Sequence, residues 1–507
     1  MKQKRILFLT NAELGQANVH LAVLQWLQSN AADVDLHLSS FPALQPSVNA
    51  LNETASPNAQ VTFHELSGPT WKESLFYRPE HQWQEICSLP PTVWSVSRAA
   101  PLMPRVACPW SADELLDLIM QVKKVVQTVD ADLVMVDNLF TPAVTVCYDI
   151  KPRWSILSPN TYREFILGKQ PRYESFWKHP PTASFIPYPV PLYLIPVALY
   201  YQREWRKNPH SDYIHSVAMS IWEKTEIYYS DWGRISFDPP EGLKVFLPSN
   251  STVDFPFSVV PEHYVSCGPI VRSAPPLKES DAELDAWIRQ RPTVYINLGT
   301  HFLYDDSGTM SLAASIKSLL DAATEAGRDI QVLWKLNKGD NSDGDFAPLH
   351  QKIGYHDRVR IVDWLLAEPI SILTSGSVIC SVNHGGANSY FEAVRFVIVL
   401  PSIAAQHLLT LPSAGVPQVV LPVWFDTYDF ARRVEYFGIG KIGNYHNAPR
   451  CSESELSPIL KQVVLGKRAE IMRSKAAAMA EACKANGDGC AVAAQGILNL
   501  ALSAAEA

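Results

Sequence analysis

Apolar and polar positions along this chain alternate in blocks that predict strands and helices in turn. Residues 5–10 are mostly apolar and are expected to form the first strand, followed by a loop and a helix at 19–29. A second strand is expected near 35–39. This strand–loop–helix–strand opening predicts a doubly wound α/β sheet, whose ligands bind beyond the carboxyl ends of the strands. His20, at the start of the helix, is expected at that edge.

The same pattern continues through the first half of the chain. Apolar residues recur on one face of 112–128, which predicts a helix, and the apolar run 133–136 predicts a buried strand that ends at Asp137. A carboxylate at the carboxyl end of a strand is well placed for function. Asp137 also fits a cap for the turn before Thr141, and both interpretations stay open at this point.

The length of 507 residues exceeds what one hydrophobic core usually holds, so we expect two domains. The chain changes character after Cys267, where a proline-containing stretch is typical of a linker. The expected division is a first domain at 1–268, a linker at 269–280, a second domain at 281–480 and a terminal helix within 481–507. Further strands are expected at 293–300, 330–335 and 359–362, and alanine-rich helices at 469–485 and 491–502.

Composition narrows the class of protein. A hydrophobic content of 47% with 19% charged residues is ordinary for a folded domain, and a net charge of −8 argues against nucleic acid or an anionic membrane as the main partner. The eight cysteines contain no C-x-x-C pair, which favours reduced thiols in the cytoplasm over disulfides or a zinc site. No apolar run reaches the length of a membrane span, and the first is too short for a signal peptide.

The segment 377–394 has the pattern of a phosphate site. A β-branched run that ends on a polar residue predicts a buried parallel strand, and His-Gly-Gly at 384–386 leads into a helical stretch. Glycines allow close backbone approach, and the helix N-terminus directs N–H groups at an anion. Asn388 and Ser389 add polar side chains there. The segment also fits a simple capping box between Ser389 and Glu392.

Further motifs follow downstream in a fixed order: Ala-Gly-Val-Pro at 414–417, Trp-Phe-Asp-Thr at 424–427 and Phe-Gly-Ile-Gly at 437–440. Together with the earlier His-Gly-Gly-x-Asn-Ser-x-x-Glu, this set resembles the donor-binding signature of the UDP-dependent glycosyltransferases of family 1. The resemblance covers most of the chain and is strongest over about 364–440.

This resemblance implies the GT-B fold, in which two Rossmann-like domains face each other. The N-terminal domain would bind the acceptor, the C-terminal domain would bind the UDP-sugar, and the terminal helix would pack back on the first domain. The implied reaction is inverting transfer of a hexose, glucose first, from a UDP-sugar to a hydroxyl of a small lipophilic acceptor. It requires no metal, because the helix end and polar side chains neutralise the diphosphate. No obligate protein partner is inferred.

The resemblance assigns the donor site residue by residue. Trp364 matches the tryptophan that stacks on uracil, and Glu392 matches the acid that accepts hydrogen bonds from the ribose. Asp426 matches the acid that binds the sugar, but Thr427 replaces the usual glutamine and weakens the assignment to glucose. The expected donor-binding residues are Gly299, Thr300, Trp364, His384, Gly385, Gly386, Asn388, Ser389, Glu392, Asp426 and Thr427.

The acceptor side is less well defined by sequence. The aromatic, proline-rich stretch 185–201 is interpreted as an acceptor-side lid or pocket wall, with shallow membrane contact and ordinary loop packing as alternatives. Several other aromatic residues predict an apolar acceptor pocket, although each also fits a core position. They are Trp71, Phe76, Tyr77, Trp83, Trp94, Phe176 and Trp177.

One departure from the family concerns the general base. The family has Gly-His shortly after the first strand, whereas this chain has Gly15-Gln16, and an amide cannot accept a proton at neutral pH. His20, one turn later, is the expected base, and Asp137 matches the acid that orients it. Direct action of Asp137 and a complete loss of catalysis are the alternatives.

A second departure is the apolar segment 395–413, which separates Glu392 from Asp426 and which the family lacks. It either loops out of the domain or is non-native sequence such as a retained intron, and we favour the intron. Two other functions stay open. A UDP-sugar epimerase shares the fold but lacks this signature, and a disabled protein would bind UDP without transferring sugar.

Overall fold

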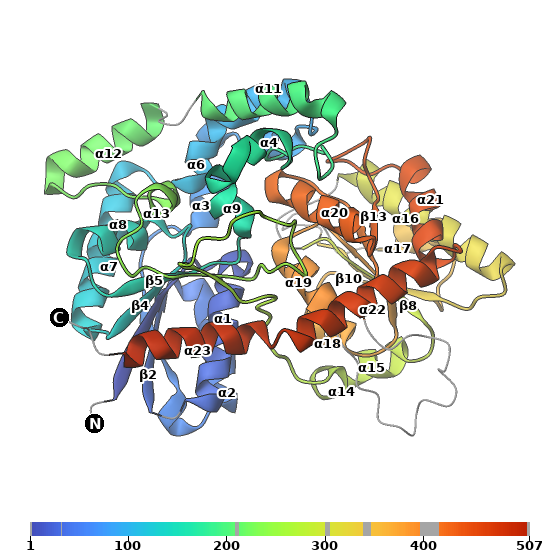
Figure 1. The fold of residues 1–507 in the computed structure, drawn as a ribbon. Helices are drawn as coiled ribbons and strands as arrows, with labels where there is room; N and C mark the ends of the chain where they lie inside the picture. Colours follow the sequence, from blue (N-terminus) through green and yellow to red (C-terminus); the bar gives the residue numbers. More distant parts are fainter. Residues whose placement is uncertain are drawn as a thin grey trace.

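Two α/β halves face each other across the molecule (Figure 1). Each half contains one parallel sheet flanked by helices, as the alternating pattern predicts. The computed structural model describes residues 3–31, 33–207, 212–299, 305–337, 346–395 and 415–503.

The first half is built on a sheet of seven described strands in the order β3-β2-β1-β4-β5-β6-β7, with every neighbouring pair parallel. Residues Ile6 to Leu9 of the central β1 are fully buried, because helices cover both faces of such a sheet. The strands are β1 (Lys4–Leu9), β2 (Val34–Ser40), β3 (Val61–Glu65), β4 (Leu133–Val136), β5 (Trp154–Leu157), β6 (Val245–Leu247) and β7 (Tyr264–Ser266).

Helix α1 begins earlier than the sequence pattern suggested. It starts at Leu14, because the N–H groups of Gln16 and Ala17 both bond to the carbonyl oxygen of Glu13 at 2.9 Å. Gln16 therefore stands in the first turn. The helices of this half are α1 (Leu14–Asn30), α2 (Gln45–Thr54), α3 (Trp71–Phe76), α4 (Trp83–Ser88), α5 (Val93–Ala99), α6 (Met103–Ala107), α7 (Ala112–Val129), α8 (Thr141–Ile150), α9 (Tyr162–Ile166), α10 (Glu174–Trp177), α11 (Ile195–Arg206), α12 (Asp212–Thr225) and α13 (Trp232–Phe237).

The second half has a sheet of six described strands in the order β10-β9-β8-β11-β12-β13, again parallel throughout. The predicted strand at 359–362 matches β10 in both bounds. The strands are β8 (Thr293–Asn297), β9 (Gln331–Lys335), β10 (Val359–Val362), β11 (Val378–Asn383), β12 (Gln418–Val420) and β13 (Gly440–Ile442). The helices are α14 (Leu277–Ser280), α15 (Ala282–Ile288), α16 (Asp306–Glu325), α17 (Ala347–Ile353), α18 (Pro369–Leu373), α19 (Ala387–Arg395), α20 (Phe425–Phe437), α21 (Glu453–Val464), α22 (Ala469–Ala485) and α23 (Gly489–Leu502).

The end of the chain ties the two halves together. Helix α22 packs against α19 in the second half, and α23 then crosses to lie along α1 and the first sheet (Figure 1). Cys490, Ala493 and Ile497 of α23 belong to the hydrophobic core of the first half. Arg153 donates from Nη1 to the carbonyl oxygen of Ser503 at 2.6 Å. The last described helix is thus part of the N-terminal core.

Buried ionic contacts also hold α20 against the first half. Arg433 donates from Nε to Asp254 Oδ1 at 2.8 Å and from Nη2 to Thr161 Oγ1 at 2.9 Å. Arg163 of α9 forms an ion pair with Asp429, and all four charged side chains are almost completely buried. These pairs position the N-terminus of α20, which borders the space between the halves.

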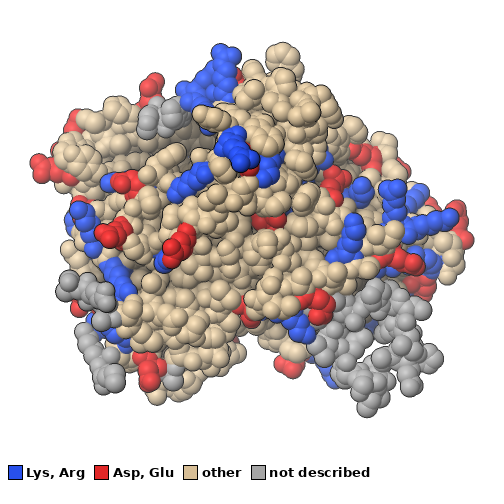
Figure 2. All heavy atoms as spheres, in the orientation of Figure 1, with Lys and Arg blue, Asp and Glu red and all other residues tan. Residues whose placement is uncertain are grey.

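Two sequence expectations fall outside the described residues: Thr300, and all of the inserted segment 395–413 except Arg395. Among the described helices, none is both long and apolar enough to cross a membrane. Figure 2 shows Lys and Arg interspersed with Asp and Glu around the margins of one face, with few charged residues across its centre.

Candidate active site

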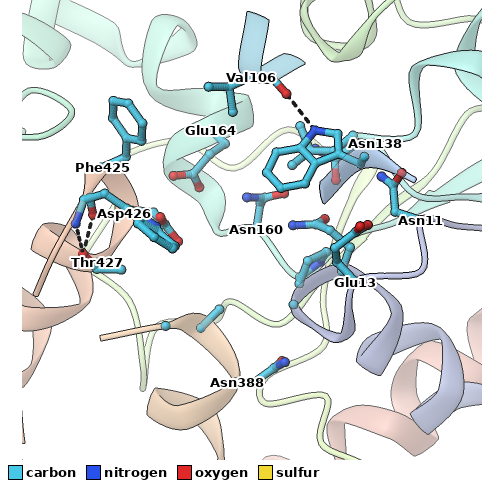
Figure 3. Close-up of a pocket in the computed structure, with 18 of the residues that line it drawn as sticks. Asn11, Glu13, Val106, Asn138, Asn160, Glu164, Asn388, Phe425, Asp426 and Thr427 are labelled. Atoms are coloured by element: carbon cyan, nitrogen blue, oxygen red, sulfur yellow. Dashed lines mark hydrogen bonds between the residues drawn. The ribbon is translucent and has the colours of Figure 1, made fainter. Parts of the chain in front are cut away.

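A cavity of about 1160 Å³ separates the two halves, and both contribute to its wall. The segments that line it follow the carboxyl ends of strands in both sheets, which is where ligands bind in doubly wound folds. Asn138 follows β4 and Asn160 follows β5 in the first half, whereas Trp364 follows β10 and His384 follows β11 in the second. Figure 3 shows Asn11, Glu13 and Asn138 on one side and Phe425, Asp426 and Thr427 on the other.

The glycine turn after β11 has the geometry that the sequence predicts for a phosphate site. Gly385 has a φ of +81°, and a Cβ there would lie 2.8 Å from the carbonyl oxygen of Thr427. Gly299, after β8, has a φ of +82°, and its Cβ would lie 2.9 Å from Cε1 of His384. Glycine is required at both positions. Gly385 is buried behind the wall, whereas Gly299, His384 and Gly386 line the cavity.

Asn388 and Ser389 stand in the first turn of α19 and line the cavity. The side chain of Asn388 donates from Nδ2 to the carbonyl oxygen of Leu14 at 3.0 Å. This bond joins the start of α19 to the start of α1 across the two halves. The N-termini of both helices therefore open onto the same part of the cavity.

Trp364 and Glu392 lie on the same wall. The indole of Trp364 is 63% exposed, so it is not a core residue, and Lys335 Nζ lies 4.3 Å from its ring centroid. Burial, with a smaller effect from the nearby charge of Glu368, raises the pKa of Glu392 to about 8, and Arg272 acts in the opposite direction. The wall thus offers a free aromatic face beside an acceptor of hydrogen bonds.

Asp426 and Thr427 start helix α20 and also line the cavity. Burial and the charge of Glu164 raise the pKa of Asp426 to about 7. The hydroxyl of Thr427 accepts from the N–H groups of Val423 at 3.1 Å and Trp424 at 3.0 Å, so it caps the helix. The hydroxyl of Thr427 is therefore used at the start of the helix. The side chain does not extend into the cavity as a glutamine amide would.

His20 does not line the cavity, which corrects the prediction that it is the base. Its imidazole is fully buried between α1 and the sheet, edge-on to Phe8 with ring centroids 6.0 Å apart. Burial lowers the pKa of His20 to about 3, because charge in this core is unfavourable. A substrate hydroxyl in the cavity cannot deliver a proton there.

Asp137 is likewise set back from the cavity. Its Oδ2 accepts from Thr10 Oγ1 at 3.3 Å and Asn11 Nδ2 at 3.2 Å, and its Oδ1 accepts from Leu139 N at 2.9 Å. Burial raises the pKa of Asp137 to about 6. The carboxylate does not bond to His20, so it neither orients that imidazole nor reaches a substrate directly. Asp137 instead fixes Asn11 and the turn at the strand ends.

The first half lines its part of the cavity with aromatic and aliphatic side chains. Trp71 donates from Nε1 to the carbonyl oxygen of Val106 at 2.8 Å, and its ring packs against Phe76 and Trp83. These three predicted aromatics line the cavity, whereas Tyr77 and Trp94 are exposed. No described residue of 185–201 lines it, which corrects the interpretation of that stretch as an acceptor lid.

Sequence reasoning missed several polar residues of the wall: Asn11, Glu13, Asn138, Asn160 and Glu164. Asn11, Asn138 and Asn160 follow the ends of β1, β4 and β5 closely, so a search for polar residues after each predicted strand would have found them. Glu13 and Glu164 lie at helix starts, where acidic residues are common and carry no specific signal.

Two facing doubly wound domains with a cavity at the strand ends are the GT-B fold. The solved structures that resemble this fold include the glycosyltransferase of kitacinnamycin, with a TM-score of 0.62, 13% identity and coverage of 99% of this chain and 100% of that one. They also include a UDP-glucosyltransferase from Polygonum tinctorium capable of glucosylating indoxyl, with a TM-score of 0.61, 13% identity and 99% of both chains covered.

Sequence comparison identifies the family. The glycosyltransferase sdnJ of Sordaria araneosa is 31% identical over 485 residues, covering 92% of this chain and 88% of the relative. No protein-family model matches the sequence. The chain belongs to the UDP-dependent glycosyltransferases of family 1, as the motifs at 364–440 predict, and it is a glycosyltransferase.

Proposed function

We propose that this glycosyltransferase moves a hexose, glucose first, from a UDP-sugar to a hydroxyl group of a small lipophilic acceptor, with inversion at the anomeric carbon. The proposal depends on one observation. A single cavity between the halves has polar residues of the donor signature on one wall and an aromatic and aliphatic surface on the other. Such a cavity suits a charged nucleotide and an apolar second substrate at the same time.

The donor wall provides a group for each part of a UDP-sugar. The exposed face of Trp364 is available for stacking on uracil, and Glu392 accepts hydrogen bonds from the ribose hydroxyls. The glycine turn after β11 and the N-terminus of α19 face the diphosphate, with Asn388 and Ser389 beside them. Asp426 accepts from the sugar. These groups also stabilise the departing diphosphate without a metal ion.

The acceptor wall favours a lipophilic alcohol or phenol. Trp71, Phe76 and Trp83 offer aromatic surface, and Met103 and Leu167 add aliphatic surface. Several polar groups, such as Asn138 and Asn160, stand near the strand ends and would orient one hydroxyl towards the donor. The eight cysteines are all free and buried, which fits a protein of a reducing compartment and supports a cytoplasmic location.

The test measures the release of UDP from several UDP-sugars. Each UDP-sugar is combined with a panel of phenols, sterols and lipid alcohols. We expect release that depends on the acceptor, with the lipophilic hydroxyl compounds as the best substrates. Glu392→Gln should weaken the binding of UDP, measured separately by titration calorimetry. Binding of UDP without release for any acceptor would contradict the proposal and favour a protein that only binds the nucleotide. Turnover of the UDP-sugar without any acceptor would favour an epimerase.

A further inference from the structure

The proposed reaction lacks a base at the position where the family has its histidine. An alcohol or phenol must lose its proton as it attacks the anomeric carbon, and a positioned base contributes about 10²–10⁴-fold to such a step. Gln16 lines the cavity at the expected place, but its amide cannot take the proton. His20 and Asp137 are both set back from the cavity. The following inference rests on the proposed function and assigns the missing group.

Glu13 lies where the acceptor hydroxyl is expected. It is the N-cap residue of α1, yet its side chain makes no capping hydrogen bond with its own helix. Instead Oε1 accepts from the backbone N–H of Lys72, in the first turn of α3, at 2.8 Å. This bond holds the carboxylate beside Asn11, on the wall of the cavity that the first half forms (Figure 3).

The second carboxylate oxygen of Glu13 has no partner. Oε2 is buried, and no described residue makes a hydrogen bond of good geometry to it. Leaving a buried carboxylate oxygen unsatisfied costs about 1–3 kcal/mol or more, so such an atom needs an explanation. A substrate hydroxyl would supply the missing donor once the carboxylate turns from this shielded position towards the cavity. The terminal torsion of glutamate is broad and roughly two-fold, so either oxygen can turn to meet it.

The donor site approaches Glu13 closely. Asn388, assigned to the diphosphate, donates to the carbonyl oxygen of Leu14, the next residue in the chain after Glu13. The sugar is attached to that diphosphate, so its anomeric carbon must lie near the start of α1. A carboxylate on the aromatic acceptor wall, one residue from the contact with the donor loop, is placed between the two substrates.

We propose that Glu13 is the general base of the transfer. Its carboxylate takes the proton of the acceptor hydroxyl as the acceptor oxygen bonds to the anomeric carbon. The bond from that carbon to the diphosphate oxygen breaks, and its electron pair leaves with UDP. Glu13 ends the step neutral, UDP gains one negative charge, and the sugar is inverted.

The other acidic residues of the wall have partners or roles of their own, and Glu368 is paired with Arg272. Glu164 accepts from the N–H and hydroxyl of Thr161 at 2.9 and 2.7 Å, which caps α9. Asp231 accepts from Gly233 N at 2.9 Å and caps α13, and Asp429 is paired with Arg163. Glu392 and Asp426 belong to the donor wall.

Two rivals remain on the described wall once His384 is assigned to the donor signature. Glu164 accepts the bonds from Thr161 through Oε2 alone, so its Oε1 is a second candidate, and the exposed His215 of α12 also lines the cavity.

The electrostatic environment of Glu13 suits the role. Burial, with a smaller effect from the charge of Asp137, raises the pKa of Glu13 above its usual value. Hydrogen bonding from the backbone N–H groups of Lys72 and of Glu13 itself, and the charge of Lys72, act in the opposite direction. A carboxylate with a raised pKa is a stronger base and remains ionised at sufficiently high pH. The rate should therefore rise with pH through the pKa of Glu13.

The test compares acceptors of different acidity with the wild type and Glu13→Gln. A base matters most for an aliphatic alcohol and least for an acidic phenol, which ionises by itself. We expect Glu13→Gln to lower kcat at least 100-fold with an aliphatic alcohol and less than tenfold with a nitrophenol. The rising limb of the pH profile should disappear, and the affinity for UDP should stay within twofold of the wild type.

Structural damage gives a different result. A merely structural role would lower the rate equally for both acceptors, or weaken UDP binding, and either outcome would overturn the assignment. Glu13→Asp keeps the carboxylate and should retain more activity than Glu13→Gln with the alcohol. If His215→Asn or Glu164→Gln, and not Glu13→Gln, shows the dependence on acceptor acidity, that residue is the base and the assignment to Glu13 is wrong. Failure of the wild type to transfer sugar to any acceptor would instead reject the proposed function.

Discussion

Thr427 stands where the family has a glutamine, and its hydroxyl serves the start of α20. A glutamine whose amide turns into the cavity to reach the sugar would leave the N–H groups of Val423 and Trp424 without this acceptor. We expect Thr427→Gln to lower the free energy of unfolding by about 1 kcal/mol without improving the use of UDP-glucose. Thr427→Ser keeps the hydroxyl and is the control. Urea unfolding and initial rates measure both effects, and a gain in rate with Thr427→Gln would contradict this account.

If Glu392 binds the ribose as proposed, the binding of UDP should depend on pH. Its pKa of about 8 leaves the carboxylate mostly protonated at neutral pH, and the ribose hydroxyls donate best to the ionised form. Affinity should therefore increase as pH rises through that pKa, by about five- to tenfold between about pH 7 and 8.5. Titration calorimetry with UDP measures this, because its phosphates are already ionised over the range. A flat profile for the wild type, or an unchanged slope in Glu392→Gln, would contradict the assignment.

The sequence predicted which residues of the second half line the cavity better than which residues of the first half do. His384, Asn388 and Glu392 follow from a local strand–turn–helix pattern, whose geometry the chain determines within a few residues. Whether His20 and Glu13 reach the cavity depends on where α1 begins and on which face of α1 packs against the sheet. The true start at Leu14 places His20 in the core and Glu13 on the wall, and no local pattern distinguishes these outcomes.

We expect donor binding to depend most on the turn between β11 and α19. A methyl group at Gly385 would meet both the carbonyl oxygen of Thr427 and Val420 Cγ1 within 3 Å, at a φ that favours glycine. We expect Gly385→Ala to displace the turn and lower the affinity for UDP at least tenfold. Gly168→Ala is the matched control, since a Cβ there meets no atom within 4 Å. Titration calorimetry with UDP separates the two, and equal affinities would contradict the proposed role of the turn.

Element type and order were predictable because the chain alternates apolar strands with amphipathic helices. The strand at 359–362 and the helix at 469–485 match β10 and α22 in both bounds. Prediction failed for 185–201, where prolines and aromatics indicate an irregular segment but not what it covers. Part of that stretch forms α11, and exposed residues such as Leu192 and Tyr193 face away from the molecule.

The relative position of the two halves depends on buried charge pairs as well as on α23. Removing one partner of a buried pair leaves an uncompensated charge, which typically costs about 3–5 kcal/mol. We expect Arg433→Met to lower the free energy of unfolding by about that amount, because Asp254 would lose its cation. Adding Asp254→Leu should recover part of the loss. Urea unfolding tests both, and a single variant as stable as the wild type would show that the pair does not hold the halves together.

The segment 395–413 stays a prediction of sequence analysis. A transcript that joins the codon of Val394 directly to that of Ser413 or Ala414 would establish a retained intron. Transcripts that keep the segment throughout would end that interpretation. Arg395 itself is described, and it donates from Nη2 to Asp488 Oδ2 at 2.7 Å, so a deletion variant should begin at residue 396.

The central claim, transfer of a sugar from UDP to an acceptor within the cavity between the halves, is tested most directly by the product. The donor and acceptor that give the highest release of UDP should be incubated with the protein, and the product analysed by mass spectrometry and proton NMR. The account predicts an acceptor that has gained one hexose through a β linkage, since the donor is α-linked. An α linkage would contradict the single inverting displacement, and an unmodified acceptor would contradict transfer itself.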